Sequence, residues 1–205
     1  MEKPNMLEYE NKYYENGYKL IAGVDEAGRG PLAGPVFAAA VVFDKDTYIE
    51  EINDSKKLTE KKREELFDVI REKALYYNIV SVDEKEIDHI NILNAALKAF
   101  EMAVTGLEEL PDVTLIDGNR CSKDFPTLAE TIVKGDAKSM SIAAASILAK
   151  VARDRYIVAL DEKYPEYNFK KHKGYPTKEH LEAVAKYGPC PIHRLTFKGV
   201  KEHVK

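Results

Sequence analysis

Four acidic residues occupy positions from which their carboxylates could meet in one cleft. Asp25 and Glu26 follow the apolar run LIAGV, Asp117 ends the run VTLID, and Asp136 precedes a long alanine-rich stretch. Glycine follows closely after the first pair and directly after Asp117, so the chain is expected to turn at both places. A carboxylate where a strand ends can point into a shared cleft instead of the core. The sequence therefore favours an acidic cleft.

Converging carboxylates of this kind are typical of a divalent-cation site. Three or four of them repel one another and raise one another's pKa values unless a cation neutralises the charge. An oxygen-only ligand set, without Cys or a spaced pair of His, favours Mg²⁺ or Mn²⁺ over zinc. We therefore expect Mg²⁺ or Mn²⁺ as the cofactor.

Asp136 has a second interpretation, because Asp is a preferred N-cap and the residues after it are expected to form a helix. Capping and metal binding are compatible. Asp154 lies 18 residues further along the same expected helix. At about 1.5 Å per residue that is roughly 27 Å, too far for a metal pair about 4 Å apart. Only one of the two can belong to the cleft, and Asp154, between Arg153 and Arg155, is expected in a surface ion pair.

The elements that must position these acids are short apolar strands and helices. Runs 19–24 and 35–43 are interpreted as two strands joined by the glycine-rich and proline-rich turn EAGRGPLAG. Adjacent residues of a regular strand face opposite sides, so Glu26 can join Asp25 only if the first strand ends there. The order predicts an α/β fold with a mixed sheet covered by helices on both faces. Further expected elements are a helix over 60–74 capped by Thr59, a strand over 75–82, a helix over 91–110, a strand over 113–117 and a helix over 137–160.

The composition is that of a soluble globular domain, with 205 residues, 44% hydrophobic and 32% charged. The sequence has no apolar run of about 18 residues and no apolar signal segment, so we expect a cytoplasmic protein without a membrane span. Cys121 and Cys190 lie far apart without a C-x-x-C pair, so both are expected to be reduced. The histidines at 89, 172, 180, 193 and 203 show no metal-ligand spacing, and a surface or core position is expected for each.

Charge is distributed unevenly along the chain, although the net charge is only −4. Residues 163–205 hold ten Lys or Arg against four Asp or Glu, whereas residues 1–162 hold 21 against 31. The basic segment could bind the phosphates of a polyanion, or it could be a lysine-rich solvated surface.

The turn after the first strand also matches a dinucleotide-binding fingerprint, G-x-G-x-x-A, over residues 28–33. That motif needs a helix directly after the glycines, so that the helix N-terminus meets pyrophosphate. Pro31, Gly34, Pro35 and a strand-like run stand there instead, which disfavours a Rossmann-type enzyme. Glycines flanking Arg29 do allow the backbone to approach a ligand sugar, with a guanidinium beside it for phosphate.

Six ordered blocks resemble the ribonuclease HII family and together cover about residues 20–200. They are GVDEAGRGPLAGPV (23–36), NDSKKL (53–58), IDGN (116–119), KGDAK (134–138), AAASILAKVARD (143–154) and GYPT (174–177). Leu195 and Thr196 depart from the late family segment, which is similar to His-Arg-x-Ser-Phe. The resemblance implies a ribonuclease H-like mixed sheet flanked by helices, with a small C-terminal helical appendage. The domain boundaries expected are a leader over 1–19, a catalytic core over 20–162 and a basic substrate-binding appendage over 163–205.

The same resemblance assigns roles to single residues. It implies that Asp25, Glu26, Asp117 and Asp136 are the catalytic and metal-binding carboxylates. The turn formed by Gly28, Arg29 and Gly30 would read a 2′-hydroxyl at an RNA to DNA junction, Lys56 would touch a backbone phosphate, and Tyr175 would stack on the next sugar. Tyr175 taken alone also fits a half-buried aromatic without a binding role.

The implied activity is two-metal-ion hydrolysis of the RNA strand in RNA–DNA hybrids, and incision at ribonucleotides embedded in duplex DNA, giving 5′-phosphate and 3′-hydroxyl ends. The expected partner is such a duplex, and the protein is expected to be a monomer. A hybrid-binding protein with a dead site is the non-enzymatic alternative. Such a protein would keep the basic segment and lose carboxylates, whereas all four are present here.

Overall fold

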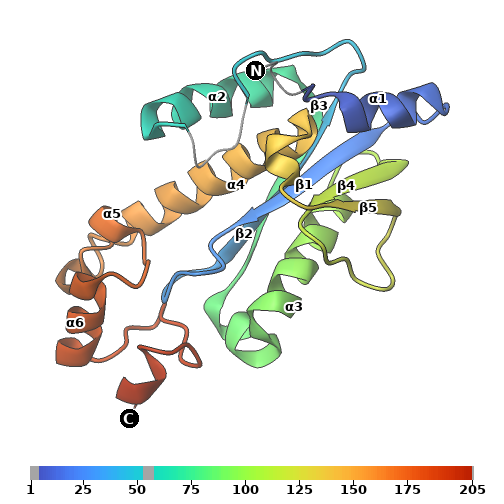
Figure 1. Ribbon diagram of the computed structural model, residues 1–205. Helices are drawn as coiled ribbons and strands as arrows, with labels where there is room; N and C mark the ends of the chain where they lie inside the picture. Colours follow the sequence, from blue (N-terminus) through green and yellow to red (C-terminus); the bar gives the residue numbers. More distant parts are fainter. Residues whose placement is uncertain (1–4, 53–57, 205) are drawn as a thin grey trace.

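A mixed β-sheet forms the centre of the protein (Figure 1). The computed structural model describes residues 5–52 and 58–204, and within them the sheet has five strands in the order β3-β2-β1-β4-β5. Strand β1 pairs antiparallel with β2 and parallel with β4, which confirms the predicted mixed sheet. The strands are β1 (Ile21–Ala27), β2 (Val36–Phe43), β3 (Ala74–Val82), β4 (Val113–Asp117) and β5 (Leu128–Ile132).

Helices cover both faces of this sheet, as predicted (Figure 1). Alternate residues of β2 explain the two layers, because Ala39 and Val41 pack towards α2 and α4 while Ala38 and Ala40 pack towards α3. The helices are α1 (Glu8–Glu15), α2 (Glu60–Lys73), α3 (Glu84–Thr105), α4 (Met140–Ala159), α5 (Phe169–His172) and α6 (Lys178–Tyr187). Short 3-10 segments cover Gly135–Ala137, Pro165–Tyr167 and Lys201–His203.

Capping residues set most helix starts. Thr59 accepts a hydrogen bond from the Lys62 N–H at the start of α2, as the sequence predicted. The predicted start at residue 91 is the second half of α3, which begins earlier, at Glu84, and kinks at Asn91 (φ 68°). There the Asn91 side chain accepts from two backbone N–H groups and caps the second half. Helix α3 ends at Thr105, before the predicted residue 110.

The N-cap of α4 corrects the local interpretation of Asp136. Helix α4 begins at Met140, where Ser139 Oγ accepts from the Ile142 N–H at 3.2 Å. Asp136 lies before it, in the 3-10 segment, and does not cap α4. The N-cap position of α4 thus belongs to Ser139.

Two elements have no counterpart among the sequence predictions, α1 and β5. Glu10 of α1 accepts from Ser139 Oγ at 2.7 Å and from the Ser141 N–H at 3.0 Å, which stabilises the start of α4. The Tyr13 hydroxyl donates to Glu130 of β5 at 2.6 Å. Helix α1 therefore packs on the same layers that position the acidic residues.

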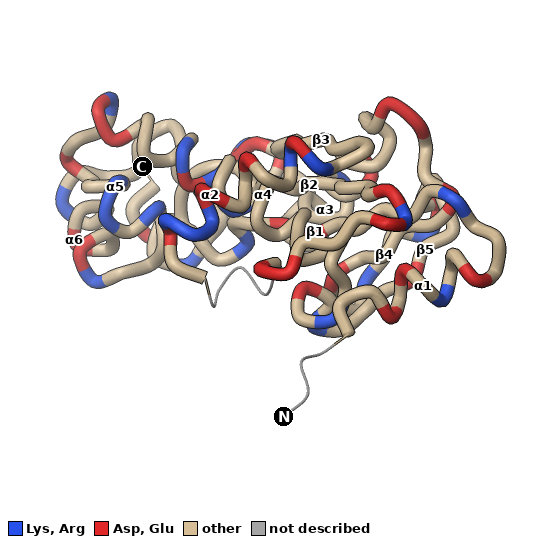
Figure 2. The backbone as a smooth tube through the Cα atoms, turned by 90° about the horizontal axis from the view of Figure 1, so that it is seen from above, with Lys and Arg blue, Asp and Glu red and all other residues tan. Residues whose placement is uncertain are grey.

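The C-terminal helices form a separate small cluster at one end of the molecule. Residues of α5 and α6 pack on Ala33 and Ile157. Figure 2 shows Lys and Arg along α5 and α6, at the end of the molecule opposite α1 and β5. Lys171 is paired there with Glu179 at 2.7 Å. Within the described residues, no helix is both long enough and apolar enough to span a bilayer.

Three of the five histidines are buried in this cluster, which confirms a core position for them. His172, His180 and His193 are at most 7% exposed. His180 Nε2 and His193 Nε2 lie 3.0 Å apart, and burial lowers the pKa of both residues to about 4. Both rings are therefore neutral near pH 7, and one nitrogen donates to the other. Cys190 lies beside His193, and both cysteines are free thiols.

Candidate active site

A cavity of about 250 Å³ opens where β1 and β4 end. It joins three of the predicted carboxylates to the glycine-rich turn and to an aromatic residue from the C-terminal cluster. Its lining residues are Asp25, Glu26, Ala27, Gly28, Arg29, Gly30, Arg63, Asp117, Ser146, Lys150 and Tyr175.

The register of the sheet brings Asp25 and Asp117 together. The parallel pairing of β1 with β4 ends at Val24 and Ile116, so these two acids come next on adjacent strands. Neighbouring strands lie about 4.8 Å apart, and residues in register share a face. The two carboxylates consequently face the same layer, below α4.

Glu26 reaches the cavity from the other face of the sheet. Strand β1 does not end at Asp25 but continues to Ala27, which corrects the predicted end at residue 24. Glu26 therefore lies opposite Ala38 on the α3 face, whereas Asp25 lies opposite Ala39 on the α4 face. Because both residues are close to the end of β1, both line the cavity although they point to different faces.

Burial and mutual repulsion disfavour the charge of Asp25. Only 5% of the residue is exposed, and its pKa is raised well above the usual range, first by burial and then by the negative charges of Glu26 and Asp117. Hydrogen bonds from Ser146 of α4 and from the Glu26 N–H, the latter at 2.7 Å, oppose this shift. Asp25 is thus held in place, and no cationic side chain in the described part of the chain is paired with its carboxylate.

Glu26 shares this environment and has a partial counter-charge. Its pKa is raised by burial, while Arg29, 3.5 Å away, acts in the opposite direction and Asp117 adds to the increase. Since half of the Arg29 side chain is exposed, this ion pair is screened by solvent.

Asp136 approaches the other acids through the backbone. Asp117 Oδ1 accepts from the Gly135 N–H at 2.7 Å and from the Asp136 N–H at 3.4 Å. The Asp136 residue is 4% exposed, and it is not among the residues that line the cavity. Its role as a fourth metal ligand stays a prediction.

The donor set of the cavity fits a hard divalent cation. It offers three carboxylates and a serine hydroxyl, without His or Cys, which is the ligand chemistry of Mg²⁺ and Mn²⁺. In the described residues, no three His, Cys, Asp or Glu side chains already stand close enough together to coordinate one ion. The raised pKa values of Asp25 and Glu26 show that positive charge is favoured here. A bound cation would relieve the repulsion among the three carboxylates, and this would favour small rotations of their side chains towards the ion.

This electrostatic strain predicts a pH-dependent stability in the absence of divalent metal. Because the folded-state pKa of Asp25 is raised, neutral Asp25 contributes stability that is complete below its usual value of 3.8 and is lost as the pH rises. In EDTA, Asp25→Asn is expected to melt at a higher temperature than wild type at pH 8, and the difference should disappear towards pH 4. Thermal melts of both proteins across this range test the expectation. A lower melting temperature for Asp25→Asn at pH 8 contradicts it.

The predicted substrate-binding residues meet at the other side of the cavity. Gly28, Arg29, Gly30 and Tyr175 all line it, and a Cβ at Gly30 would lie 3.8 Å from Tyr175 Cε1. Tyr175 is 39% exposed, and Lys150 Nζ lies 5.5 Å from its ring centroid. The ring is therefore accessible from the cavity and has positive charge beside it. Lys56, the other predicted contact, lies outside the described residues.

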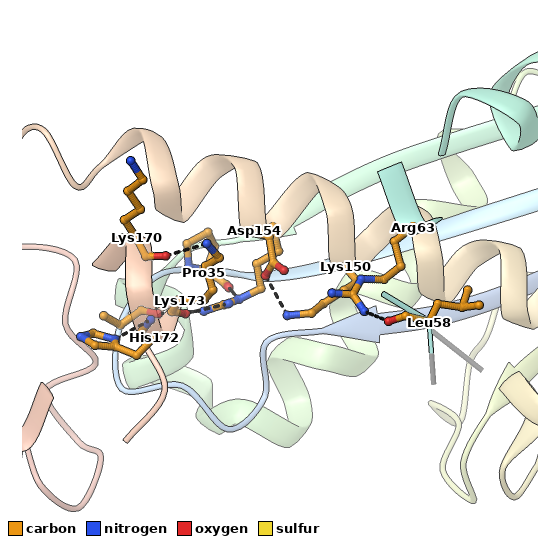
Figure 3. Close-up of polar contacts among 11 residues, drawn as sticks. Pro35, Leu58, Arg63, Lys150, Asp154, Lys170, His172 and Lys173 are labelled. Atoms are coloured by element: carbon orange, nitrogen blue, oxygen red, sulfur yellow. Dashed lines mark hydrogen bonds and ion pairs between the residues drawn. The ribbon is translucent and has the colours of Figure 1, made fainter. Parts of the chain in front are cut away.

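Sequence reasoning missed Ala27 and three polar lining residues, Arg63, Ser146 and Lys150. Ser146 and Lys150 are four residues apart and so share one face of α4, a signal that the sequence does contain. Arg63 comes from α2, where no sequence pattern distinguishes it. Figure 3 shows its guanidinium directed at the Leu58 carbonyl, to which it donates at 2.5 Å.

Asp154 forms an ion pair, as predicted, but not on the surface. Its carboxylate accepts from Lys150 Nζ at 2.8 Å, and the residue is only 8% exposed (Figure 3). The prediction of a surface position is therefore wrong. Asp154 is absent from the cavity lining.

The dinucleotide-binding interpretation is wrong for a topological reason. After the glycine-rich turn, the next element of the chain is strand β2, beginning at Val36. No helix N-terminus follows the glycines in this described stretch to meet a pyrophosphate.

Comparisons with known proteins agree on one family. The family model described as Ribonuclease HII matches residues 22–200. A protein named Ribonuclease HII from Acetivibrio thermocellus is 60% identical over 94% of this chain and 75% of its own length. One from Caldicellulosiruptor bescii is 56% identical over 96% of this chain and 95% of its own. The crystal structure of the ribonuclease H2 from Pyrococcus horikoshii OT3 superposes with a TM-score of 0.75 at 32% identity, covering 89% of this chain and 96% of that one.

Proposed function

The chain belongs to the ribonuclease HII family and is a metal-dependent endoribonuclease that acts on RNA–DNA hybrids, and from this premise we propose that the cavity at the ends of β1 and β4 is its active site. The observation that carries the proposal is the meeting of three carboxylates, the Gly28 to Gly30 turn and Tyr175 in one cavity. The three carboxylates suit metal-assisted hydrolysis, whereas the turn and Tyr175 suit the recognition of a nucleotide sugar.

The proposed reaction is hydrolysis of a phosphodiester in which water attacks the phosphorus, the P–O3′ bond breaks and the 3′-oxygen leaves and is protonated, giving 5′-phosphate and 3′-hydroxyl ends. Asp25, Glu26 and Asp117 would hold the metal ions, and Asp136 would join them as the fourth ligand. Two Mg²⁺ or Mn²⁺ ions held there would supply a lowered pKa for the attacking water and charge stabilisation for the leaving 3′-oxygen. Ser146 keeps Asp25 oriented through its hydrogen bond, and the Gly135 N–H does the same for Asp117 at 2.7 Å.

The remaining lining residues bind and orient the nucleic acid. We assign 2′-hydroxyl recognition to the turn of Gly28, Arg29 and Gly30, and stacking on the following deoxynucleotide sugar to Tyr175. Arg63 and Lys150 add positive charge to the same cavity, where a phosphate would need it. Lys56 is proposed to contact backbone phosphate.

The basic segment from Lys163 onward is proposed to hold the duplex outside the cavity. This assignment keeps the division into a core over 20–162 and an appendage over 163–205. Lys170 is exposed and contributes to that surface, whereas the charge of Lys171 is partly offset by Glu179. We propose that the protein is active as a monomer, because a single chain already brings the carboxylates, the Gly28 to Gly30 turn and Tyr175 into one cavity.

The finer part of the proposal is incision at single ribonucleotides within duplex DNA. The test is to incubate the protein with a labelled DNA duplex that carries one ribonucleotide, in Mg²⁺, Mn²⁺ or EDTA. We expect a single nick beside the ribonucleotide that requires either metal and leaves a 3′-hydroxyl. An all-DNA duplex of the same sequence is the control. If hybrids are cut and this substrate is not, the proposed junction recognition is wrong while the hybrid activity stands.

A further inference from the structure

The glycine-rich turn is held from inside the protein by one buried guanidinium. Arg194, which is 0% exposed, donates from Nε to the Gly34 carbonyl at 2.9 Å. Its NH1 donates to the carbonyls of Arg29 and Pro31 at 3.0 and 2.9 Å, and its NH2 donates to the Gly28 carbonyl at 2.6 Å. A single side chain therefore binds four carbonyl groups of this turn.

Arg194 is buried and forms no ion pair with an acidic side chain among the described residues, although the negative charges of Glu84 and Asp88 act on it from a distance. All of its hydrogen bonds within the described residues go to backbone carbonyls, and its guanidinium lies 5.0 Å from the Phe197 ring centroid. Burial and the charge of nearby Arg153 lower the pKa of Arg194 to about 9, so it remains protonated near pH 7. Burying an unpaired charge is costly, and only a full set of hydrogen bonds offsets that cost.

These bonds decide which way the peptide groups of the turn point. In a trans peptide the N–H is directed opposite to the C=O, and the described residues contain no cis bond. Because the Gly28 and Arg29 carbonyls point inward to Arg194, the N–H groups of Arg29 and Gly30 point the other way. Both residues line the cavity, and neither N–H has a partner in the described residues. Two adjacent donors are thereby presented to the cavity.

The same segment links the turn to Tyr175. The Arg194 N–H donates to the Leu32 carbonyl at 2.8 Å, and the Leu32 N–H donates to the Gly174 carbonyl at 2.8 Å. Arg153 of α4 adds bonds to the carbonyls of Ala33 and Lys173, at 3.1 and 3.0 Å. The turn and the residue before Tyr175 are thus fixed relative to each other.

We propose that Arg194 is a positioning residue for sugar discrimination, which orients the N–H groups of Arg29 and Gly30 towards the 2′-hydroxyl without itself touching nucleic acid. The inference rests on the proposed function of the turn. Lysine cannot replace Arg194 in this role, because one ammonium nitrogen has three donors and cannot span carbonyls that a planar guanidinium reaches from three nitrogens.

The test compares Arg194→Lys with Val184→Ala. Val184 is fully buried in the C-terminal cluster, and its aliphatic side chain has no hydrogen-bond donor for the carbonyls of the turn, so its truncation controls for lost stability. Affinities for a duplex with one ribonucleotide and for the all-DNA duplex are measured by fluorescence anisotropy in Ca²⁺, and cleavage kinetics in Mg²⁺. All values are corrected for the folded fraction from circular dichroism. We expect Arg194→Lys to reduce the preference for the ribonucleotide duplex about tenfold, and Val184→Ala to retain it.

Phe197→Leu provides a second, milder variant, because it removes the ring beside the guanidinium and leaves the four hydrogen-bond donors in place. We expect the preference for the ribonucleotide duplex over the all-DNA duplex to fall twofold to threefold. If Arg194→Lys does not fold, the inference is tested with Phe197→Leu instead. If the folded variants keep the wild-type preference, the positioning role of Arg194 is wrong and the proposed function still stands. If wild type shows no preference for the ribonucleotide duplex, the proposed function fails, and the inference fails with it.

Discussion

Asp25→Asn is expected to lower the rate of hydrolysis about 1,000-fold or more while binding of an RNA–DNA hybrid survives. The substitution keeps the shape of the side chain and removes a negative charge from a residue that is 5% exposed. In the proposed site Asp25 would hold a metal ion, and such an ion supplies several kcal/mol of charge stabilisation in the transition state, where each 1.36 kcal/mol corresponds to a factor of ten in rate. Single-turnover cleavage at saturating enzyme measures the chemical step, and anisotropy measures binding.

The matched control is Asp46→Asn, which makes the same chemical change in the exposed turn after β2, away from the cavity. It should leave both rate and affinity unchanged. Mg²⁺ should also raise the melting temperature of wild type more than that of Asp25→Asn, because the metal relieves repulsion that the variant lacks. Equal shifts in the two proteins would remove Asp25 from the metal site.

The second large effect is a contrast between two glycines of the same turn. Gly28 has φ +101°, and a Cβ there would overlap the buried Arg153 side chain. The left-handed backbone costs about 1–2 kcal/mol and the overpacking about 1–3 kcal/mol, so Gly28→Ala should be strongly destabilised. Gly30 has no positive φ, and its nearest neighbour would be Tyr175 Cε1 at 3.8 Å. Gly30→Ala should therefore melt like wild type.

Gly30→Ala is consequently the clean test of sugar recognition. If the backbone of the turn approaches a 2′-hydroxyl, the added methyl group collides with the ribose and cleavage at a single ribonucleotide falls about tenfold or more. Thermal melts of both alanine variants and cleavage of the single-ribonucleotide duplex by Gly30→Ala measure the two effects. Wild-type cleavage by Gly30→Ala would show that the glycine serves the turn alone.

The sequence was enough to predict the family and the mixed sheet, and three of the four acidic residues that it singled out line the cavity. Apolar runs that lead into Asp25 and Asp117 predict carboxylates at one edge of the sheet, and the structure places both acids directly after the last residues that pair β1 with β4. Local rules also identified the Thr59 cap and the second half of α3, since both depend on contacts within a few residues. Six ordered blocks were enough to identify a relative of ribonuclease HII.

Local patterns failed where distant segments decide the outcome. Strand β1 extends through Glu26 because β2 supplies hydrogen-bonding partners as far as Ala27, which no feature of residues 19–24 reveals. Asp136 does not cap α4, because Ser139 occupies that position and Glu10, far away in sequence, supports it.

Only the tertiary structure decided how the turn of Gly28 to Gly30 is presented to the cavity. A glycine-rich turn has many accessible conformations, and its own sequence does not select one. The selection comes from Arg194, more than 160 residues later, whose guanidinium binds four carbonyls of the turn. Sequence thus fixes which groups can do the chemistry, whereas the burial of a distant charge fixes the direction in which the turn presents its donors.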